Sequence, residues 1–232
     1  MYSSNIAMLQ KVAIGLDDLL TKVVFVGGAV AELYADNPEL SDIRPTKDVD
    51  VVIELGSRLK YYELEEKLRS KGFKNDIRKD APICRWIYKD TLVDIMPDDE
   101  SIIGFSNQWY QQGIKHKITK TLPNGIEIFM FNPVYFVASK LAAHKGRGGN
   151  DLRQSHDFED IIYILENYSG LLKDILQSNK KLQQYLKISF DELLQNDNIT
   201  EGIESALPYG SEKENTQIIL TIMQQIADLK IK

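Results

Sequence analysis

Apolar and polar positions follow two different periodicities over the first 131 residues. Short apolar or alternating runs, bounded by Gly, Asn, Asp and Pro, indicate strands, and a period near 3.6 indicates helices. The strand-like runs cover 23–26, 48–53, 83–88, 91–96, 115–122 and 126–131. Helical spacing covers 5–20 and 57–70, where Ser57 is a suitable N-cap. The pattern predicts an α/β (α+β) fold with a mixed central sheet flanked by helices.

The character of the chain changes after residue 131. Asn132-Pro133 opens a helix, because proline is well suited to a first helical turn. Helical spacing then continues to the end of the chain, interrupted by a Gly-rich break at 146–150 and by Asn196-Asp197-Asn198. We therefore expect two domains, a sheet-containing core at 1–131 and a helical region at 132–232.

Composition sets broad limits on the function. Of 232 residues, 43% are hydrophobic and 27% are charged, and the net charge is −6, so there is no overall basic field that would attract nucleic acid. The single cysteine, Cys84, excludes an intramolecular disulfide framework and fits a reducing compartment. We interpret it as a small core residue. No apolar run is long enough for a bilayer and no signal peptide is evident, so we expect a cytoplasmic protein with no membrane partner.

The stretch from 23 to 54 carries the first candidate chemistry. Gly27-Gly28 follows the first strand, and glycines let backbone N–H groups approach a phosphate closely at a helix N-terminus. Asp48 and Asp50 share one face of the next strand, because side chains alternate. Paired carboxylates repel each other, and a hard cation such as Mg²⁺ relieves that repulsion. A phosphate cradle beside such a pair is suited to phosphoryl or nucleotidyl transfer.

Asp94 is a third candidate ligand. It lies between Val93 and Ile95 in an apolar run, where an unpaired buried carboxylate would be costly. We expect a metal ion to be the partner of this carboxylate, with Asp94 on a strand adjacent to that of Asp48 and Asp50. The alternative is a strand position that faces solvent and has no function.

A second constellation follows in the helical region. Lys140, His144 and Arg147 recur at i, i+4 and i+7, which places them on one basic stripe of a helix. Asp157 and Asp160 lie one turn apart near the start of the next helix. The helix dipole favours acids at that end, so these two carboxylates have a purely structural explanation as well.

These motifs, in this order, resemble a known family. Gly27-Gly28 followed by Asp48-Val49-Asp50 resembles the catalytic core of the DNA polymerase β-like nucleotidyltransferase superfamily. The similarity is greatest to the AbiEii-type abortive-infection toxin nucleotidyltransferases, and it covers roughly residues 20 to 165. The segments that carry this closer resemblance are Thr46-Lys47-Asp48-Val49-Asp50, Lys140-Leu141-Ala142-Ala143, Arg147 and Asp157-Phe158-Glu159-Asp160.

The resemblance implies transfer of a nucleoside monophosphate from an NTP, such as ATP, to an acceptor. Asp48, Asp50 and Asp94 would hold two Mg²⁺ ions. Asp157 would be a further catalytic residue, either a base for the acceptor or a partner that orients Lys140. The nucleotide-binding residues implied are Gly27, Gly28, Lys47, Lys140 and Arg147. The helical region would complete the active-site groove.

The acceptor implied is RNA, such as a tRNA end, or a protein side chain. The setting would be toxin–antitoxin or phage defence, with a cognate antitoxin as a candidate partner. The linker at 146–154, with Gly-Gly-Asn-Asp, departs from the family pattern and leaves the acceptor open. Three alternatives remain. An aminoglycoside-type nucleotidyltransferase would use the same acids, and a degenerate fold would serve only for binding. A CCA-adding enzyme fits less well, because Gly28 is not followed by that family's Arg-Asp pair.

Overall fold

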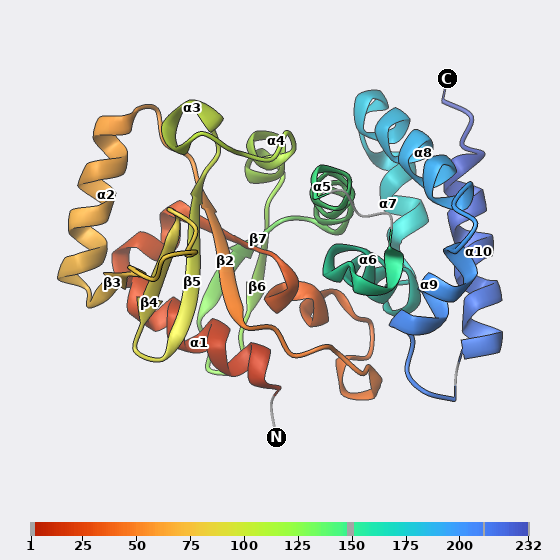
Figure 1. The fold of residues 1–232 in the computed structure, drawn as a ribbon, viewed down its shortest axis with the longest axis horizontal. Coiled ribbons are helices and arrows are strands. Elements are labelled where there is room, and N and C mark those ends of the chain that lie inside the picture. The colour runs from red at the N-terminus through yellow and green to blue at the C-terminus, as the bar shows by residue number, and fades with distance from the viewer. Residues whose placement is uncertain (1–2, 148–150, 211, 232) are drawn as a thin grey trace. The chain divides into compact units, whose positions relative to one another are not determined.

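The computed structural model describes residues 3–147, 151–210 and 212–231 and divides the chain into two compact units (Figure 1). The first unit comprises Met1–Val30 and Arg44–Tyr135, and the second comprises Ala31–Ile43 and Phe136–Lys232. The division differs from a single boundary at residue 131, because a short excursion after the first strand belongs to the helical unit.

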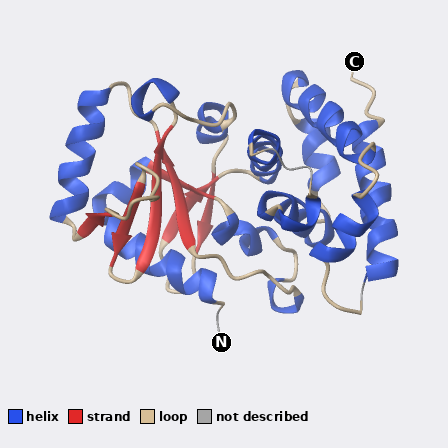
Figure 2. Cartoon of the chain, in the orientation of Figure 1, coloured by secondary structure: helices blue, strands red, loops and turns tan. Residues whose placement is uncertain are grey.

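A seven-stranded sheet forms the centre of the first unit, drawn in red in Figure 2. Its strand order is β3-β4-β5-β2-β1-β7-β6. The strands are β1 (Val23–Val26), β2 (Asp48–Ile53), β3 (Phe73–Asn75), β4 (Arg85–Tyr88), β5 (Thr91–Pro97), β6 (Ile118–Thr121) and β7 (Glu127–Met130). The pairs β2–β5 and β1–β7 are parallel and the others are antiparallel, so the predicted mixed sheet is confirmed.

The central strands follow the pattern of their side chains. All four residues of β1 are buried, as expected for a strand paired on both sides. In β2, Val49 and Val51 are buried, whereas Asp48 and Asp50 remain partly accessible. The alternation predicted from the sequence therefore puts the two carboxylates on one face of the sheet.

Helices surround the sheet within the first unit. They are α1 (Ser4–Leu16), the 3₁₀ helix η1 (Asp17–Lys22), α2 (Arg58–Ser70), α3 (Glu100–Ile103) and α4 (Tyr110–Lys115). Ser57 caps α2 as predicted, since its Oγ accepts a hydrogen bond from the Lys60 N–H. The helix predicted at 5–20 is wrong in its last turn, which is 3₁₀ rather than α.

The strand predicted to begin at residue 115 begins three residues later. The predicted run starts with three polar residues, Lys115, His116 and Lys117, and the backbone there ends a helix. The N–H groups of Gly113 and His116 donate to the carbonyls of Trp109 and Gln112, and His116 is the C-cap of α4. Local helical hydrogen bonds therefore determine the backbone conformation at this point.

The second unit is helical. Its elements are the 3₁₀ helices η3 (Pro38–Leu40) and η4 (Leu152–Gln154) and the α-helices α6 (His156–Asn167), α7 (Leu171–Gln177), α8 (Lys180–Leu194), α9 (Ile199–Ala206) and α10 (Glu212–Ala227). Two more helices cross the unit boundary, the 3₁₀ helix η2 (Gly28–Tyr34) and α5 (Pro133–Gly146). Throughout the part of the chain that the structure describes, we find no helix whose length and apolar character would let it cross a bilayer.

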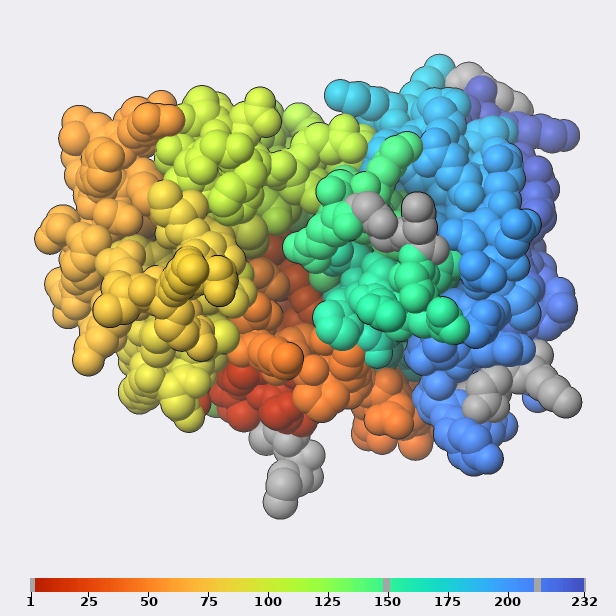
Figure 3. All heavy atoms as spheres, viewed as in Figure 1, coloured from red at the N-terminus to blue at the C-terminus, as the bar shows by residue number. Residues whose placement is uncertain are grey.

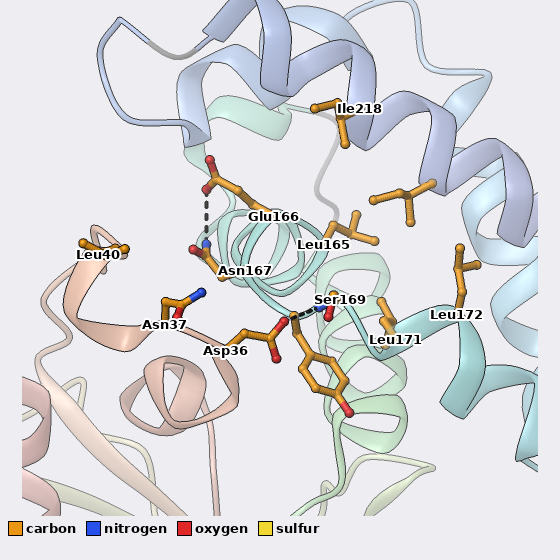
Figure 4. A pocket seen from close by; sticks show the side chains of 12 residues that line it. Asp36, Asn37, Leu40, Leu165, Glu166, Asn167, Ser169, Leu171, Leu172 and Ile218 are labelled. Atoms are coloured by element: carbon orange, nitrogen blue, oxygen red, sulfur yellow. Dashed lines mark hydrogen bonds between the residues drawn. The ribbon is translucent and has the colours of Figure 1, made fainter.

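Hydrogen bonds explain why residues 31–43 belong to the helical unit. The Asp36 N–H donates to the Asn167 carbonyl at 2.9 Å, and the Asp36 carboxylate accepts from the Ser169 N–H at 2.9 Å. The hydroxyls of Ser41 and Tyr163 are 2.6 Å apart. Figure 4 shows the pocket of roughly 400 Å³ beside these contacts, with Leu40 and Ile218 among its apolar lining residues. No short sequence pattern predicts such hydrogen bonds between segments that lie far apart in the chain.

A buried asparagine fixes the chain just before β2. Asn5 of α1 is 0% exposed, and its amide donates to the Arg44 carbonyl at 3.1 Å and accepts from the Thr46 N–H at 2.9 Å. The Thr46 hydroxyl in turn donates to the Asp48 carbonyl at 3.1 Å. These part-buried bonds tie α1 to the chain before β2, and they set the position at which β2 starts.

We predict that Asn5→Ala lowers the free energy of unfolding by about 1–3 kcal/mol, because it leaves the Arg44 carbonyl and the Thr46 N–H without their partner. The measurement is urea unfolding followed by circular dichroism. Asn124→Ala is the control, since Asn124 makes a comparable bond to the Ile126 N–H in an exposed turn. Equal costs for the two variants would contradict the role given to Asn5.

Candidate active site

Three carboxylates converge on one face of the sheet in the first unit. Parallel pairing of β2 with β5 places Asp50 directly opposite Asp94, and Asp48 lies two residues earlier on the same face of β2. Asp94 is 8% exposed, so it does not point into solvent. The expectation that Asp94 lies on a strand adjacent to Asp48 and Asp50 is confirmed, and the solvent-facing explanation of Asp94 is wrong.

Arg85 of β4 binds two of these carboxylates. Antiparallel pairing places Arg85 opposite Asp94, and Nε and Nη2 donate to the two Asp94 oxygens at 2.7 Å each. Nη2 also donates to Oδ2 of Asp48 at 2.8 Å. The hydrogen bonds to Asp94 raise the pKa of Arg85 above its usual range, and the charges of Asp94, Asp48 and Asp50 add to the effect. The guanidinium therefore stays charged, and from β4 it bridges Asp48 of β2 and Asp94 of β5.

Sequence reasoning missed Arg85, although the sequence holds a signal for it. The two-residue turn at Lys89-Asp90 pairs Tyr88 with Thr91, and the antiparallel register then sets Arg85 opposite Asp94. A cation at that register position is the expected partner for a carboxylate in an apolar run. Asn5 was missed as well, because nothing in a helical pattern marks which polar residue will reach another segment.

Gly27 makes room for Asp50. Val26 pairs with Asp50 across β1 and β2, and the next residue, Gly27, has φ +72°. A Cβ atom at Gly27 would lie 2.6 Å from Cγ of Asp50 and closer still to its Oδ2. Glycine is therefore required both by the left-handed backbone and by the close approach of the carboxylate.

The phosphate cradle expected at Gly27-Gly28 takes a different local form. The helix after the turn, η2, is a 3₁₀ helix that starts at Gly28, not an α-helix. Lys47, the residue before β2, is exposed. The structure does not test whether Gly27, Gly28 or Lys47 contacts a nucleotide, and these assignments remain predictions.

The chemistry of the donor set fits a hard divalent cation, because all three acids offer carboxylate oxygens. Yet among residues 3–147, 151–210 and 212–231, no group of three or more His, Cys, Asp or Glu side chains is arranged to hold a metal ion. The cation beside Asp48 and Asp94 in this arrangement is the guanidinium of Arg85. Binding of a metal by these acids would therefore require rearrangement of Arg85.

Cys84 lies next to this cluster and is 3% exposed. Burial, together with the nearby carboxylates of Asp94 and Asp50, raises the pKa of its thiol to about 12. A thiol that keeps its proton at neutral pH is a poor nucleophile. Its interpretation as a buried core residue is confirmed.

A second cluster of charges lies within the helical unit. Lys140 Nζ of α5 is 2.6 Å from Oδ2 of Asp160 and 3.2 Å from Oδ1 of Asp157. Arg147 Nη1 is 2.6 Å from the other oxygen of Asp157. Asp157 and Asp160 are 4% and 2% exposed, so they are not solvated helix-start acids. The structure thus brings together Lys140, Arg147 and Asp157, which the sequence had singled out.

His144 completes this second cluster. Its Nδ1 is 2.6 Å from Oγ of Ser155, the N-cap of α6, which also accepts from the Phe158 N–H. Burial lowers the pKa of His144, and the nearby Asp157 carboxylate partly opposes that shift. The lower pKa favours the neutral imidazole near pH 7, which leaves Lys140 and Arg147 as the cations that balance the acids.

We predict that Gly27→Ala destabilises the first unit more than Gly125→Ala does. Both glycines have positive φ, +72° and +83°, but nothing lies within 4 Å of a Cβ at Gly125. The shared backbone cost is about 1 kcal/mol, and overlap with Asp50 adds to it only at Gly27. Thermal unfolding of both variants measures the difference. Equal midpoints would show that Asp50 does not lie against Gly27.

We also predict that Lys140→Met lowers stability by about 3–5 kcal/mol, because it removes a cation from two buried carboxylates. Lys145→Met on the same helix is the control. Lys145 forms an ion pair with Glu192, and the two side chains are 69% and 50% exposed. Losing this exposed pair should cost about 0–1 kcal/mol of stability. Denaturant unfolding gives both values. The added change Asp160→Asn should recover part of the loss, and no recovery would speak against a charge-based cost.

No family model and no curated protein matches this chain. Two solved structures from Helicobacter pylori resemble it over most of their length. JHP933 has 13% identity and a TM-score of 0.46, with 98% of this chain and 93% of that chain covered. A protein provisionally named a nucleotidyltransferase has 12% identity and a TM-score of 0.47, with 98% and 96% covered. At this level of similarity neither structure identifies what this chain does.

Proposed function

We propose that this chain is a Mg²⁺-dependent nucleotidyltransferase that moves a nucleoside monophosphate from an NTP to an acceptor. The observation that carries the proposal is the arrangement of Asp48, Asp50 and Asp94 on one face of two adjacent parallel strands. The turn at Gly27 lies so close to Asp50 that a Cβ atom at Gly27 would overlap the Asp50 carboxylate. Three carboxylates that gather at one place are costly unless a cation joins them, and oxygen-only ligands favour Mg²⁺.

In this proposal Asp48, Asp50 and Asp94 are the residues that hold the metal. Bound Mg²⁺ supplies positive charge to the phosphates and makes the acceptor hydroxyl more acidic. The acceptor oxygen forms a bond to the α-phosphorus, the bond to the pyrophosphate oxygen breaks so that pyrophosphate leaves, and the hydroxyl proton passes to solvent water. The chain's own contribution is positioning, since β2 and β5 hold the acids in fixed register and Gly27 leaves space for Asp50.

We assign Lys140 and Arg147, together with Lys47, to the triphosphate. For Asp157 two roles were open, a base for the acceptor or a partner that orients Lys140. One of its oxygens is engaged by Lys140 and the other by Arg147, which supports the orienting role. Gly28 remains assigned to the nucleotide as part of the turn.

The motif resemblance to the AbiEii-type toxins supports an RNA acceptor, such as a tRNA end, or a protein side chain. It equally supports a toxin–antitoxin or phage-defence setting with a cognate antitoxin. A second function, a degenerate fold that binds without catalysis, is favoured by one observation. Arg85 already neutralises Asp48 and Asp94, which a binding module could retain permanently.

The direct test is incubation of the protein with each α-labelled NTP, Mg²⁺ and total cellular RNA, followed by separation of labelled products. Asp48→Asn and Asp94→Asn should each lower transfer about a thousandfold, because they remove several kcal/mol of transition-state stabilisation. Asp90→Asn, at a side chain that is 79% exposed on the β4–β5 turn, is the matched control and should keep full transfer. Wild-type turnover by both active-site variants would exclude the proposed site.

A further inference from the structure

Arg85 is held in place through both its side chain and its backbone. Its side chain is 21% exposed and makes three charge-assisted hydrogen bonds to Asp94 and Asp48. Its backbone is fixed as well, since its N–H donates to the Pro82 carbonyl at 2.9 Å and its carbonyl accepts from the Asp76 N–H at 3.1 Å. The side chain can move only by giving up the carboxylates, because the backbone is tied down.

The oxygens that Arg85 occupies are the same oxygens that a metal would need. Both oxygens of Asp94 and Oδ2 of Asp48 accept from the guanidinium. A lysine or histidine could give way to a metal by losing its proton, but an arginine keeps its charge at any ordinary pH. A divalent ion that binds these oxygens therefore competes with the guanidinium for them.

A displaced guanidinium needs a new anionic partner, and a triphosphate provides one. Its planar fork of N–H donors suits phosphate oxygens as well as it suits a carboxylate. A triphosphate also brings oxygen ligands and negative charge for the incoming ion. The metal ion thus replaces the positive charge of Arg85 beside the carboxylates, and the triphosphate gives the displaced guanidinium a new anionic partner.

We propose that Arg85 is a resident cation that keeps the metal affinity of the nucleotide-free protein low and couples metal binding to nucleotide binding. The inference rests on the proposed function, in that it takes Asp48, Asp50 and Asp94 as the metal ligands. On binding of the metal with an NTP, Arg85 leaves Asp94 and contacts phosphate oxygens. By linkage, each of the two ligands strengthens the binding of the other.

The Arg85 side chain reaches solvent, since it is 21% exposed, and the loop before it is exposed as well. The preceding loop, 76–84, carries Ile77 and Ile83, which are 94% and 63% exposed. The yellow segment that includes β3 and β4 lies on the face turned to the viewer in Figure 3. The same loop holds a second arginine, Arg78, whose guanidinium pairs with Asp76 rather than with the three acids. That residue supplies a control of equal charge close by in the sequence.

The test is titration of the nucleotide-free protein with MnCl₂, with free Mn²⁺ followed by electron paramagnetic resonance. Arg85→Gln should bind Mn²⁺ roughly ten- to a hundredfold more tightly than wild type, because the hydrogen bonds to charged groups no longer have to be broken. Arg78→Gln removes the same charge and should leave the affinity unchanged. The unfolding midpoint should rise with Mn²⁺ in Arg85→Gln and hardly change in wild type.

Arg85→Lys is a second variant that tests the proposal if Arg85→Gln does not fold. It keeps the charge but lacks the two-pronged fork, so it should show a smaller gain in Mn²⁺ affinity. Adding Asp94→Asn to either variant should abolish the gain, which would tie the gain to the proposed ligand.

Two results would overturn the proposal, and they separate it from the proposed function. Suppose that wild type and Arg85→Gln bind Mn²⁺ equally, and that Asp94→Asn weakens both. The metal site then stands, but Arg85 does not control it. If no variant shows Mn²⁺ binding that depends on Asp94, both the resident-cation role and the metal-dependent function fail.

Discussion

The balance of charge on one face of the sheet is the constraint on which the first unit depends. Asp48, Asp50 and Asp94 meet where β2 and β5 run parallel, and carboxylates in such a place need a cation. Arg85 provides it by spanning Asp94 and Asp48. The same rule governs the helical unit, where buried acids of α6 are balanced by Lys140 of α5 and by Arg147, which directly follows that helix. Each cluster therefore links separate elements through charge as well as through apolar packing.

Arg85 also reverses the expected effect on protein stability of neutralising one of the three carboxylates. Considered without Arg85, the carboxylates only repel each other, so neutralising one should hold or raise the stability of the metal-free protein. With Arg85 present, removing the charge of Asp94 would weaken two charge-assisted hydrogen bonds of a largely buried guanidinium and leave Asp48 as its charged partner. The acids and the arginine are therefore one unit, in which the effect of each residue depends on the others.

Much of this arrangement could be predicted from the sequence, because it is encoded locally. Apolar runs, the Lys89-Asp90 turn and the Ser57 cap predict strands, hairpin and helix correctly, and alternation gives the shared face of Asp48 and Asp50. Pairing between distant segments is different. The bonds of Asn5 to the chain before β2, and the attachment of 31–43 to the helical unit, join residues far apart in sequence and leave no periodic trace. The strand predicted from residue 115 starts too early, since Lys115, His116 and Lys117 lack the apolar alternation of a strand and lie at a helix end.

The measurement that tests the account most directly is anomalous diffraction from crystals soaked with MnCl₂ and an unhydrolysable nucleotide. The account predicts an anomalous peak within coordination distance of Asp48, Asp50 and Asp94, about 2.0–2.2 Å from their oxygens as for other hard cations of this size. It also predicts that Arg85 has left Asp94 for the phosphates. A nucleotide bound elsewhere, with Arg85 still on Asp94 and no peak at the three acids, would contradict it.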